Sequence, residues 1–198
     1  MINEERISRY LERHARKLAL IEAMWRDPLV QLYNDPELPD PGTLQTYGSV
    51  FLAGPTSRRQ ILEYNWRSEA VHFLRAAGFL GAIYVPEPRG EEDDGDFTEK
   101  AYIHQWESTR LRDAYKLAFW VPRQGTEMLG LNTNFEWGFA TAEFLFRREN
   151  KRRWLFIGWP DEAERMGLPN HYAVELAHGH RYLTLELLCS AIAGKPAP

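Results

Sequence analysis

The sequence predicts a three-layer α/β domain, a parallel sheet with helices on both faces, preceded by an N-terminal helical arm. From residue 49 onward, short apolar segments alternate with longer segments of helical periodicity. The short segments are continuously apolar, which is typical of parallel strands buried on both faces. Proline or glycine follows most of them and marks the loops. We therefore divide the chain into an arm, residues 1–46, and one domain, residues 47–198.

The arm begins with a predicted helix over residues 3–26. Residues of one stripe recur at spacings of three and four, which predicts an amphipathic helix that ends before Pro28. The stripe consists of Ile7, Leu11, His14, Leu18, Ile21 and Trp25. It is expected either to pack on the domain or to pair with another subunit. Residues 34–46 are rich in proline and predict an extended linker.

The remaining elements follow in order within the domain. Strands are predicted at residues 49–53, 82–85, 116–121 and 154–158, and helices at 64–77, 99–113, 133–148, 172–177 and 184–193. Ligands of open parallel sheets bind beyond the carboxyl ends of the strands. The loops at 54–63, 86–97 and 122–133 leave such ends, so we expect them to form the walls of the site.

Composition narrows the class of protein. With 198 residues, 44% hydrophobic content and a net charge of −4, the chain suits one globular domain and does not suggest a nucleic-acid polymer as partner. The basic run at residues 147–153 is expected to be a solvated helix end. No apolar segment is long enough to span a membrane, and the single cysteine, Cys189, excludes a disulfide framework. We expect a cytoplasmic protein in a reducing compartment.

Glu136 is the leading candidate for chemistry. It lies three residues after Thr133, so one interpretation is a Thr-x-x-Glu capping box at a helix start. The other is functional, because the helix follows a strand end and its amino terminus favours an ionised carboxylate. Such a carboxylate can attack an anomeric carbon. Gly138 would let a ligand approach the helix closely.

Several other residues are candidates for ligand contacts, each with an ordinary structural alternative. Gly54 and Pro55 follow the first strand as a turn, and the glycine would leave room beneath a sugar. Arg58 or Arg59, in the same loop, would bind a phosphate; the alternative is an ordinary exposed arginine. The pairs Trp66-Arg67 and Trp106-Glu107 either line the pocket edge or combine a core tryptophan with a solvated charge.

Asp113 is a candidate general acid, since a buried carboxyl of raised pKa protonates a leaving base; otherwise it is an ordinary helix-end residue. The histidines near residues 171–180 lack accompanying ligands, and no G-x-S-x-G segment occurs, so neither a metal site nor a serine hydrolase is expected.

Taken in order, these segments resemble the nucleoside 2-deoxyribosyltransferase-like superfamily. The resemblance covers residues 50–55, 66–70, 106–107, 118–122 and 133–138, with a less specific tail from residue 154. It implies a flavodoxin-like fold, with Glu136 as nucleophile in cleavage of an N-glycosidic bond through a glycosyl-enzyme intermediate. A second base or water would accept the sugar. The resemblance further implies that no metal or organic cofactor is needed. It also implies that the protein forms a homo-oligomer, either a dimer or a larger assembly.

One departure concerns the residue before the third strand. The family commonly has Ala-Asp there, with the Asp touching the ligand, whereas this chain has Ala114-Tyr115. Asp113, Tyr115 or Glu107 takes that role, or the chemistry is altered. Glu136 and Asp113 are thus the expected catalytic residues. The expected binding residues are Gly54, Pro55, Arg58, Trp66, Trp106, Glu107, Tyr115, Asn134 and Gly138.

The expected partner is a nucleoside or nucleotide. Two alternatives to the transferase remain: a nucleotide 5′-monophosphate N-glycosidase and a catalytically silent nucleotide-binding module. The sequence leaves the base, the sugar and the acceptor open.

Overall fold

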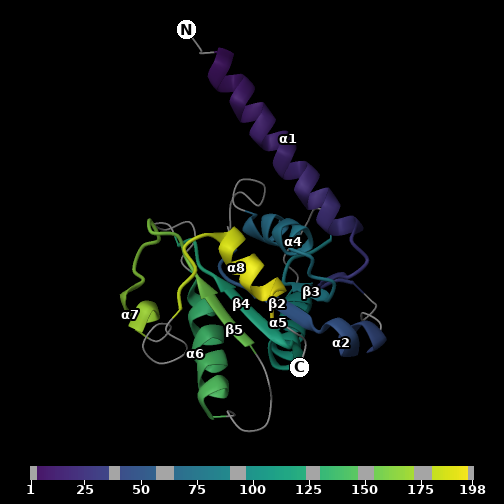
Figure 1. The fold of residues 1–198 in the computed structure, drawn as a ribbon, viewed down its shortest axis with the longest axis vertical. Helices are drawn as coiled ribbons and strands as arrows, with labels where there is room; N and C mark the ends of the chain where they lie inside the picture. The colour runs from purple at the N-terminus through teal and green to yellow at the C-terminus, as the bar shows by residue number, and fades with distance from the viewer. Residues whose placement is uncertain are drawn as a thin grey trace.

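A computed structural model describes residues 4–35, 41–56, 65–89, 97–123, 130–146, 154–171 and 180–195. Within these residues, five parallel strands form one sheet in the order β1-β3-β2-β4-β5 (Figure 1). The strands are β1 (Val30–Leu32), β2 (Ser49–Ala53), β3 (Ala82–Val85), β4 (Lys116–Trp120) and β5 (Trp154–Gly158). Every residue of these five strands is buried except Trp154, the first residue of β5. Such burial is typical of parallel strands that are covered on both faces.

Helices cover both faces of this sheet. They are α1 (Glu4–Arg26), α2 (Pro41–Tyr47), α4 (Trp66–Ala76), α5 (Phe97–Asp113), α6 (Leu131–Phe146), α7 (Gly167–Asn170) and α8 (Leu185–Ala193). Alternate residues of β2 point to opposite faces, so Val50 and Leu52 join a core with α4 and α8. Phe51 and Ala53 join a second core with α5 and α6. The predicted three-layer α/β fold is confirmed.

The segment before residue 47 differs from the predicted linker. Residues 30–32 form β1, which pairs in register with β3, Val30 opposite Ile83. Residues 41–47 form the helix α2, while residues 36–40 of the predicted linker lie outside the described part of the chain. A three-residue strand is too short to show periodicity. The sheet therefore includes residues on the amino-terminal side of residue 47.

The N-terminal helix lies within one residue of its predicted bounds and projects from the sheet domain (Figure 1). Only its last turns are buried: Ile21 and Met24 pack into the domain, where α1 contacts α4. Leu11 and Leu18, from the same predicted stripe, are 59% and 39% exposed. Part of the stripe thus packs on the domain, whereas Leu11 and Leu18, nearer the amino terminus, stay exposed among the residues that the structure describes.

Among the other elements, the predicted strands at 49–53, 82–85 and 154–158 agree with the structure. α5 and α6 each begin two residues earlier than predicted, and the predicted helix at 172–177 lies outside the described residues. None of the helices described is both long and apolar enough to cross a membrane.

Candidate functional site

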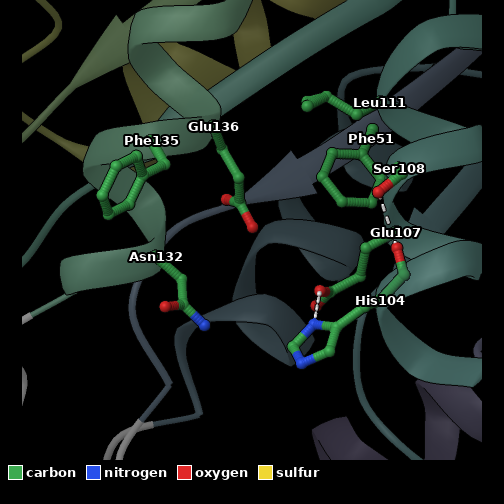
Figure 2. A pocket seen from close by; sticks show the side chains of 8 residues that line it. All are labelled: Phe51, His104, Glu107, Ser108, Leu111, Asn132, Phe135 and Glu136. Carbon is green, nitrogen blue, oxygen red and sulfur yellow. Dashed lines mark hydrogen bonds and ion pairs between the residues drawn. The ribbon is translucent and has the colours of Figure 1, made fainter. Parts of the chain in front are cut away.

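A pocket of about 280 Å³ opens between α5 and α6, beside β2 (Figure 2). Parallel α/β sheets bind ligands where the carboxyl ends of their strands meet the following helices. The lining residues are Phe51 from β2, His104, Glu107, Ser108 and Leu111 from α5, and Asn132, Phe135 and Glu136 from α6. The lining combines three apolar side chains with two carboxyls, an imidazole, an amide and a hydroxyl, a combination typical of small-molecule sites.

Glu136 lies at the centre of this pocket and is largely desolvated. Figure 2 shows its carboxyl group directed into the cavity, toward Glu107. The pKa of Glu136 is raised from 4.5 to about 7, mainly by burial and also by the negative charge of Glu107, whereas the charges of Arg67 and His104 lower it. A carboxyl that titrates near neutral pH in a pocket is a marker of a functional site.

Glu107 is the second carboxyl. Burial raises its pKa too, and the positive charge of Arg67 opposes that shift. His104, one turn earlier on α5, places Nδ1 3.7 Å from a Glu107 oxygen. Because Glu107 and Glu136 interact, their protons belong to the pair rather than to either residue.

The structure changes the interpretation of Glu136 made from the sequence. The first α6 bond runs from the Asn134 amide to the Gly130 carbonyl, so Gly130 caps the helix and Thr133 lies inside it. Glu136 is therefore in the second turn, and the Thr133–Glu136 capping box is not formed. The expectation that the helix terminus keeps Glu136 ionised is wrong, because that field is confined to the first turn and burial dominates.

Asp113 and Tyr115 do not line this pocket. Asp113 is the last residue of α5 and is exposed. The Tyr115 amide donates to Ser49 Oγ at 3.3 Å, and Ser49 is the first residue of β2. Both residues thus lie at the amino end of the sheet, opposite the carboxyl ends. The assignment of Asp113 as the general acid and of Tyr115 as a ligand contact is not supported by their placement, and of the three residues considered for this role Glu107 is the one that lines the pocket.

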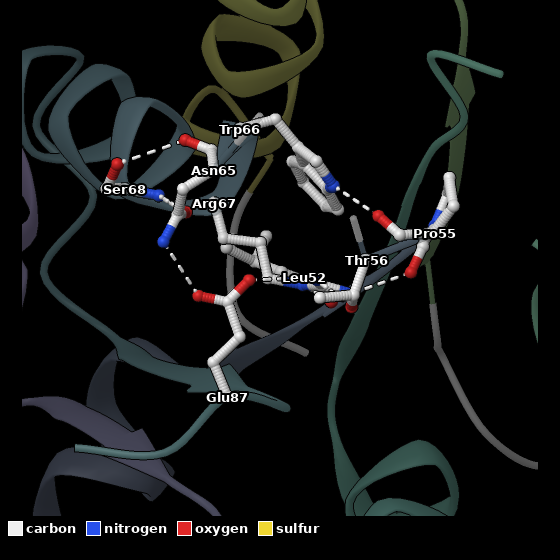
Figure 3. A network of polar contacts seen from close by, with 9 residues as sticks. Leu52, Pro55, Thr56, Asn65, Trp66, Arg67, Ser68 and Glu87 are labelled. Carbon is white, nitrogen blue, oxygen red and sulfur yellow. Dashed lines mark hydrogen bonds and ion pairs between the residues drawn. The ribbon is translucent and has the colours of Figure 1, made fainter. Parts of the chain in front are cut away.

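The turn after β2 is held by a buried polar network around Arg67 (Figure 3). The indole N–H of Trp66 donates to the Pro55 carbonyl at 3.0 Å, and Arg67 donates to the Gly54 carbonyl at 2.6 Å. Gly54 is required by packing: a Cβ there would lie 2.8 Å from the Trp66 ring. These residues fix the backbone at the strand end, and none of them lines the pocket.

Three further candidates are accounted for by local structure. Trp106 is 6% exposed and packs against Phe51 and Tyr84, so it supports the pocket wall from beneath. The Asn134 side chain accepts a hydrogen bond from Arg123 at 2.7 Å and does not line the pocket. Gly138 is exposed on α6, also outside the lining. Arg58 and Arg59 lie outside the described residues.

Most of the lining was not singled out in the sequence. Asn132 and Phe135 lie within one turn of Glu136 on α6, as His104, Ser108 and Leu111 lie within one turn of Glu107 on α5. Spacings of three and four from each carboxyl would have found Asn132, His104 and Leu111, whereas Phe135 and Ser108 are sequence neighbours of the carboxyls. As for metals, no group of three or more His, Cys, Asp or Glu in the described segments is arranged to hold an ion.

Comparisons with known proteins add little to this geometry. No family model matches the sequence, and no curated protein matches it. Among solved structures, the chain is similar to the crystal structure of a conserved protein from Enterococcus faecalis V583. The TM-score is 0.43 with 15% identity, and the match covers 74% of this chain and 88% of that one. The functional argument therefore depends on the pocket.

Proposed function

We propose that the pocket cleaves the N-glycosidic bond of a nucleoside or nucleotide and passes the sugar to a second base or to water. The observation that carries the proposal is the pair of partly buried carboxyls, Glu136 and Glu107, facing one cavity from two helices. Two carboxyls flanking a scissile bond are the usual equipment for glycosidic cleavage. The motif resemblance, centred on Glu136, supports the same chemistry.

The reaction needs the singly protonated form of the pair in which Glu107 holds the proton and Glu136 is ionised, and the raised pKa of Glu136 makes this the less populated of the two singly protonated forms. A Glu136 carboxylate oxygen attacks C1′ as the bond from C1′ to the base nitrogen breaks, and the nitrogen takes its proton from the Glu107 carboxyl. In the second step a new base or water attacks C1′, the ester to Glu136 breaks, and Glu107 takes up the proton that the acceptor loses. The apolar wall with Phe51 and Leu111 limits water around the reacting centre.

A base-release assay tests the proposal. The protein is incubated with a panel of nucleosides, deoxynucleosides and their 5′-monophosphates, and free base is measured by chromatography, with and without a second base. Sugar transfer to the added base indicates a transferase, and release without it a hydrolase. Ligand binding without free base from any member of the panel would contradict the proposal and leave a binding module.

Base release should follow a bell-shaped pH profile. The doubly protonated pair lacks a nucleophile and the fully ionised pair lacks an acid, so only the singly protonated form is active. Since the pKa of Glu136 is about 7 and that of Glu107 is raised above 4.5, we expect the alkaline limb near pH 7 and the acid limb below it. The measurement is kcat/KM from pH 4 to 9. A rate that stays constant from pH 6 to 9 would exclude a shared proton.

Phe135 is expected to bind the base. Its side chain is 81% exposed although it lines the pocket, an unusual exposure for a large apolar ring. Stacking of a base on an aromatic ring contributes about 1–3 kcal/mol. Phe135→Ala should therefore raise KM roughly tenfold or more with little change in kcat, whereas Phe135→Tyr should remain close to wild type. Equal KM values for the alanine and tyrosine variants would argue against stacking.

A further inference from the structure

The polar network behind the pocket contains an ion pair buried almost completely. Arg67 is 2% exposed, and its Nη1 lies 2.8 Å from a Glu87 oxygen. Glu87 is 7% exposed and follows β3, while Arg67 lies in the first turn of α4. Removing an ion pair from water costs several kcal/mol per charge, so a pair at this depth requires close compensation by other groups.

That compensation comes from the strand ends that surround the pair (Figure 3). The Arg67 guanidinium also donates to the carbonyls of Leu52 at 3.2 Å and Gly54 at 2.6 Å, and to Thr56 Oγ1 at 2.9 Å. Asn65 donates to the second Glu87 oxygen at 3.0 Å. One side chain therefore joins the ends of two neighbouring strands, the turn after β2 and the start of α4.

The network adjoins the pocket through β2, because Leu52, whose carbonyl accepts from Arg67, directly follows Phe51, which lines the pocket. Arg67 lowers the pKa of both Glu107 and Glu136 and so opposes the effect of their burial. The other charged groups that act on Glu136 are Glu107 and His104, both on α5. Arg67 thus supplies positive charge from the opposite face of the sheet, where α4 packs.

We propose that Arg67 is a positioning residue of the carboxyl pocket: it fixes the turn after β2 and presents positive charge to Glu107 and Glu136, and Glu87 moderates that charge. The inference deepens the proposed function, on which it rests for its catalytic meaning. A purely structural ion pair would contribute to folding alone. An ion pair that acts electrostatically must also change the pKa of Glu136. Removing its negative charge alone and removing both of its charges should then shift this pKa in opposite directions.

Two variants change that balance in opposite directions. Glu87→Gln leaves the charge of Arg67 uncompensated, so the titration midpoint of Glu136 should fall by about half a pH unit or more. The double variant Arg67→Gln/Glu87→Gln removes both charges without leaving one buried alone, and because Arg67 acts more strongly on Glu136 than Glu87 does, the midpoint should rise. Carboxyl ¹³C NMR of glutamate-labelled protein gives the midpoints without substrate, with Glu136 assigned by its loss in Glu136→Gln.

The matched control is the other arginine ion pair of α4. Arg75 Nε lies 2.7 Å from an Asp27 oxygen, and Arg75 also bonds the carbonyls of Phe79 and Gly81. Asp27→Asn and Arg75→Gln/Asp27→Asn should lower the unfolding temperature and leave the Glu136 midpoint unchanged. Midpoints within about 0.2 units of wild type in either folded Arg67–Glu87 variant, with only stability reduced, would overturn the proposal. A missing base-release activity would overturn the proposed function and not this inference.

Discussion

Glu136→Gln should reduce base release by roughly a thousandfold or more, because the amide cannot form the glycosyl-enzyme ester that the proposed reaction requires. The substitution is close to isosteric, and within the described segments no hydrogen bond to the Glu136 carboxyl contributes to its raised pKa. The loss should therefore appear in kcat, with KM for the nucleoside changed little. The measurement is steady-state release of free base for both proteins at pH 6.5.

Asp113→Asn provides the matched control for a carboxylate. Asp113 is exposed at the amino end of the sheet, on the side opposite the pocket, so this variant should retain the wild-type rate. Wild-type turnover in Glu136→Gln would remove the mechanism. A large loss in Asp113→Asn would restore the role that the sequence first suggested for this residue.

The same Glu136→Gln variant should be more stable than wild type at alkaline pH. The folded state binds the Glu136 proton more tightly than the unfolded state, so the wild-type protein loses stability as pH rises from about 4.5 through about 7. Glutamine lacks this titration. Since the side chain keeps some exposure, we expect a difference on the order of 1–2 kcal/mol between pH 5 and pH 8. Urea unfolding at the two pH values measures it.

The fold and the site were predictable to different degrees. Apolar runs such as 50–53 and 117–120 carry a strong local signal, since every side chain in them is buried. β1 has only three residues, and its pairing with β3 is set by tertiary contacts that periodicity does not encode. Glu136 was identifiable because it follows a strand end.

The second carboxyl of the site, the partner of Glu136, was less certain from the sequence, because Asp113 and Glu107 are six residues apart on one helix. Only the direction of α5 relative to the sheet decides that Glu107 reaches the pocket and Asp113 does not. The raised pKa of Glu136 could also not be predicted from the sequence. The helix terminus and burial have opposite effects on a carboxyl, and burial depends on the whole surrounding structure.

Gly54→Ala should be the most damaging small substitution in the domain. Gly54 has φ +154°, a conformation that residues with a side chain rarely adopt. A Cβ there would overlap the Trp120 carbonyl oxygen and press on the Trp66 ring. The carbonyl belongs to β4, next to β2 in the sheet, and the indole is held by its bond to Pro55, so neither can move away cheaply. We expect a loss of about 3–5 kcal/mol in the free energy of unfolding.

Gly138→Ala is the contrasting substitution. Gly138 is exposed in the interior of α6, and a Cβ there would meet no atom within 4 Å. Alanine should therefore stabilise the helix by about 0.5–1 kcal/mol and leave base release unchanged, if the ligand contacts Glu136 from the pocket side. Chemical denaturation and the base-release assay on both variants separate the two glycines. A tolerated Gly54→Ala would mean that β2 and β4 approach less closely than the structure has them. A loss of activity in a stable Gly138→Ala would place the ligand against the exposed face of α6 instead.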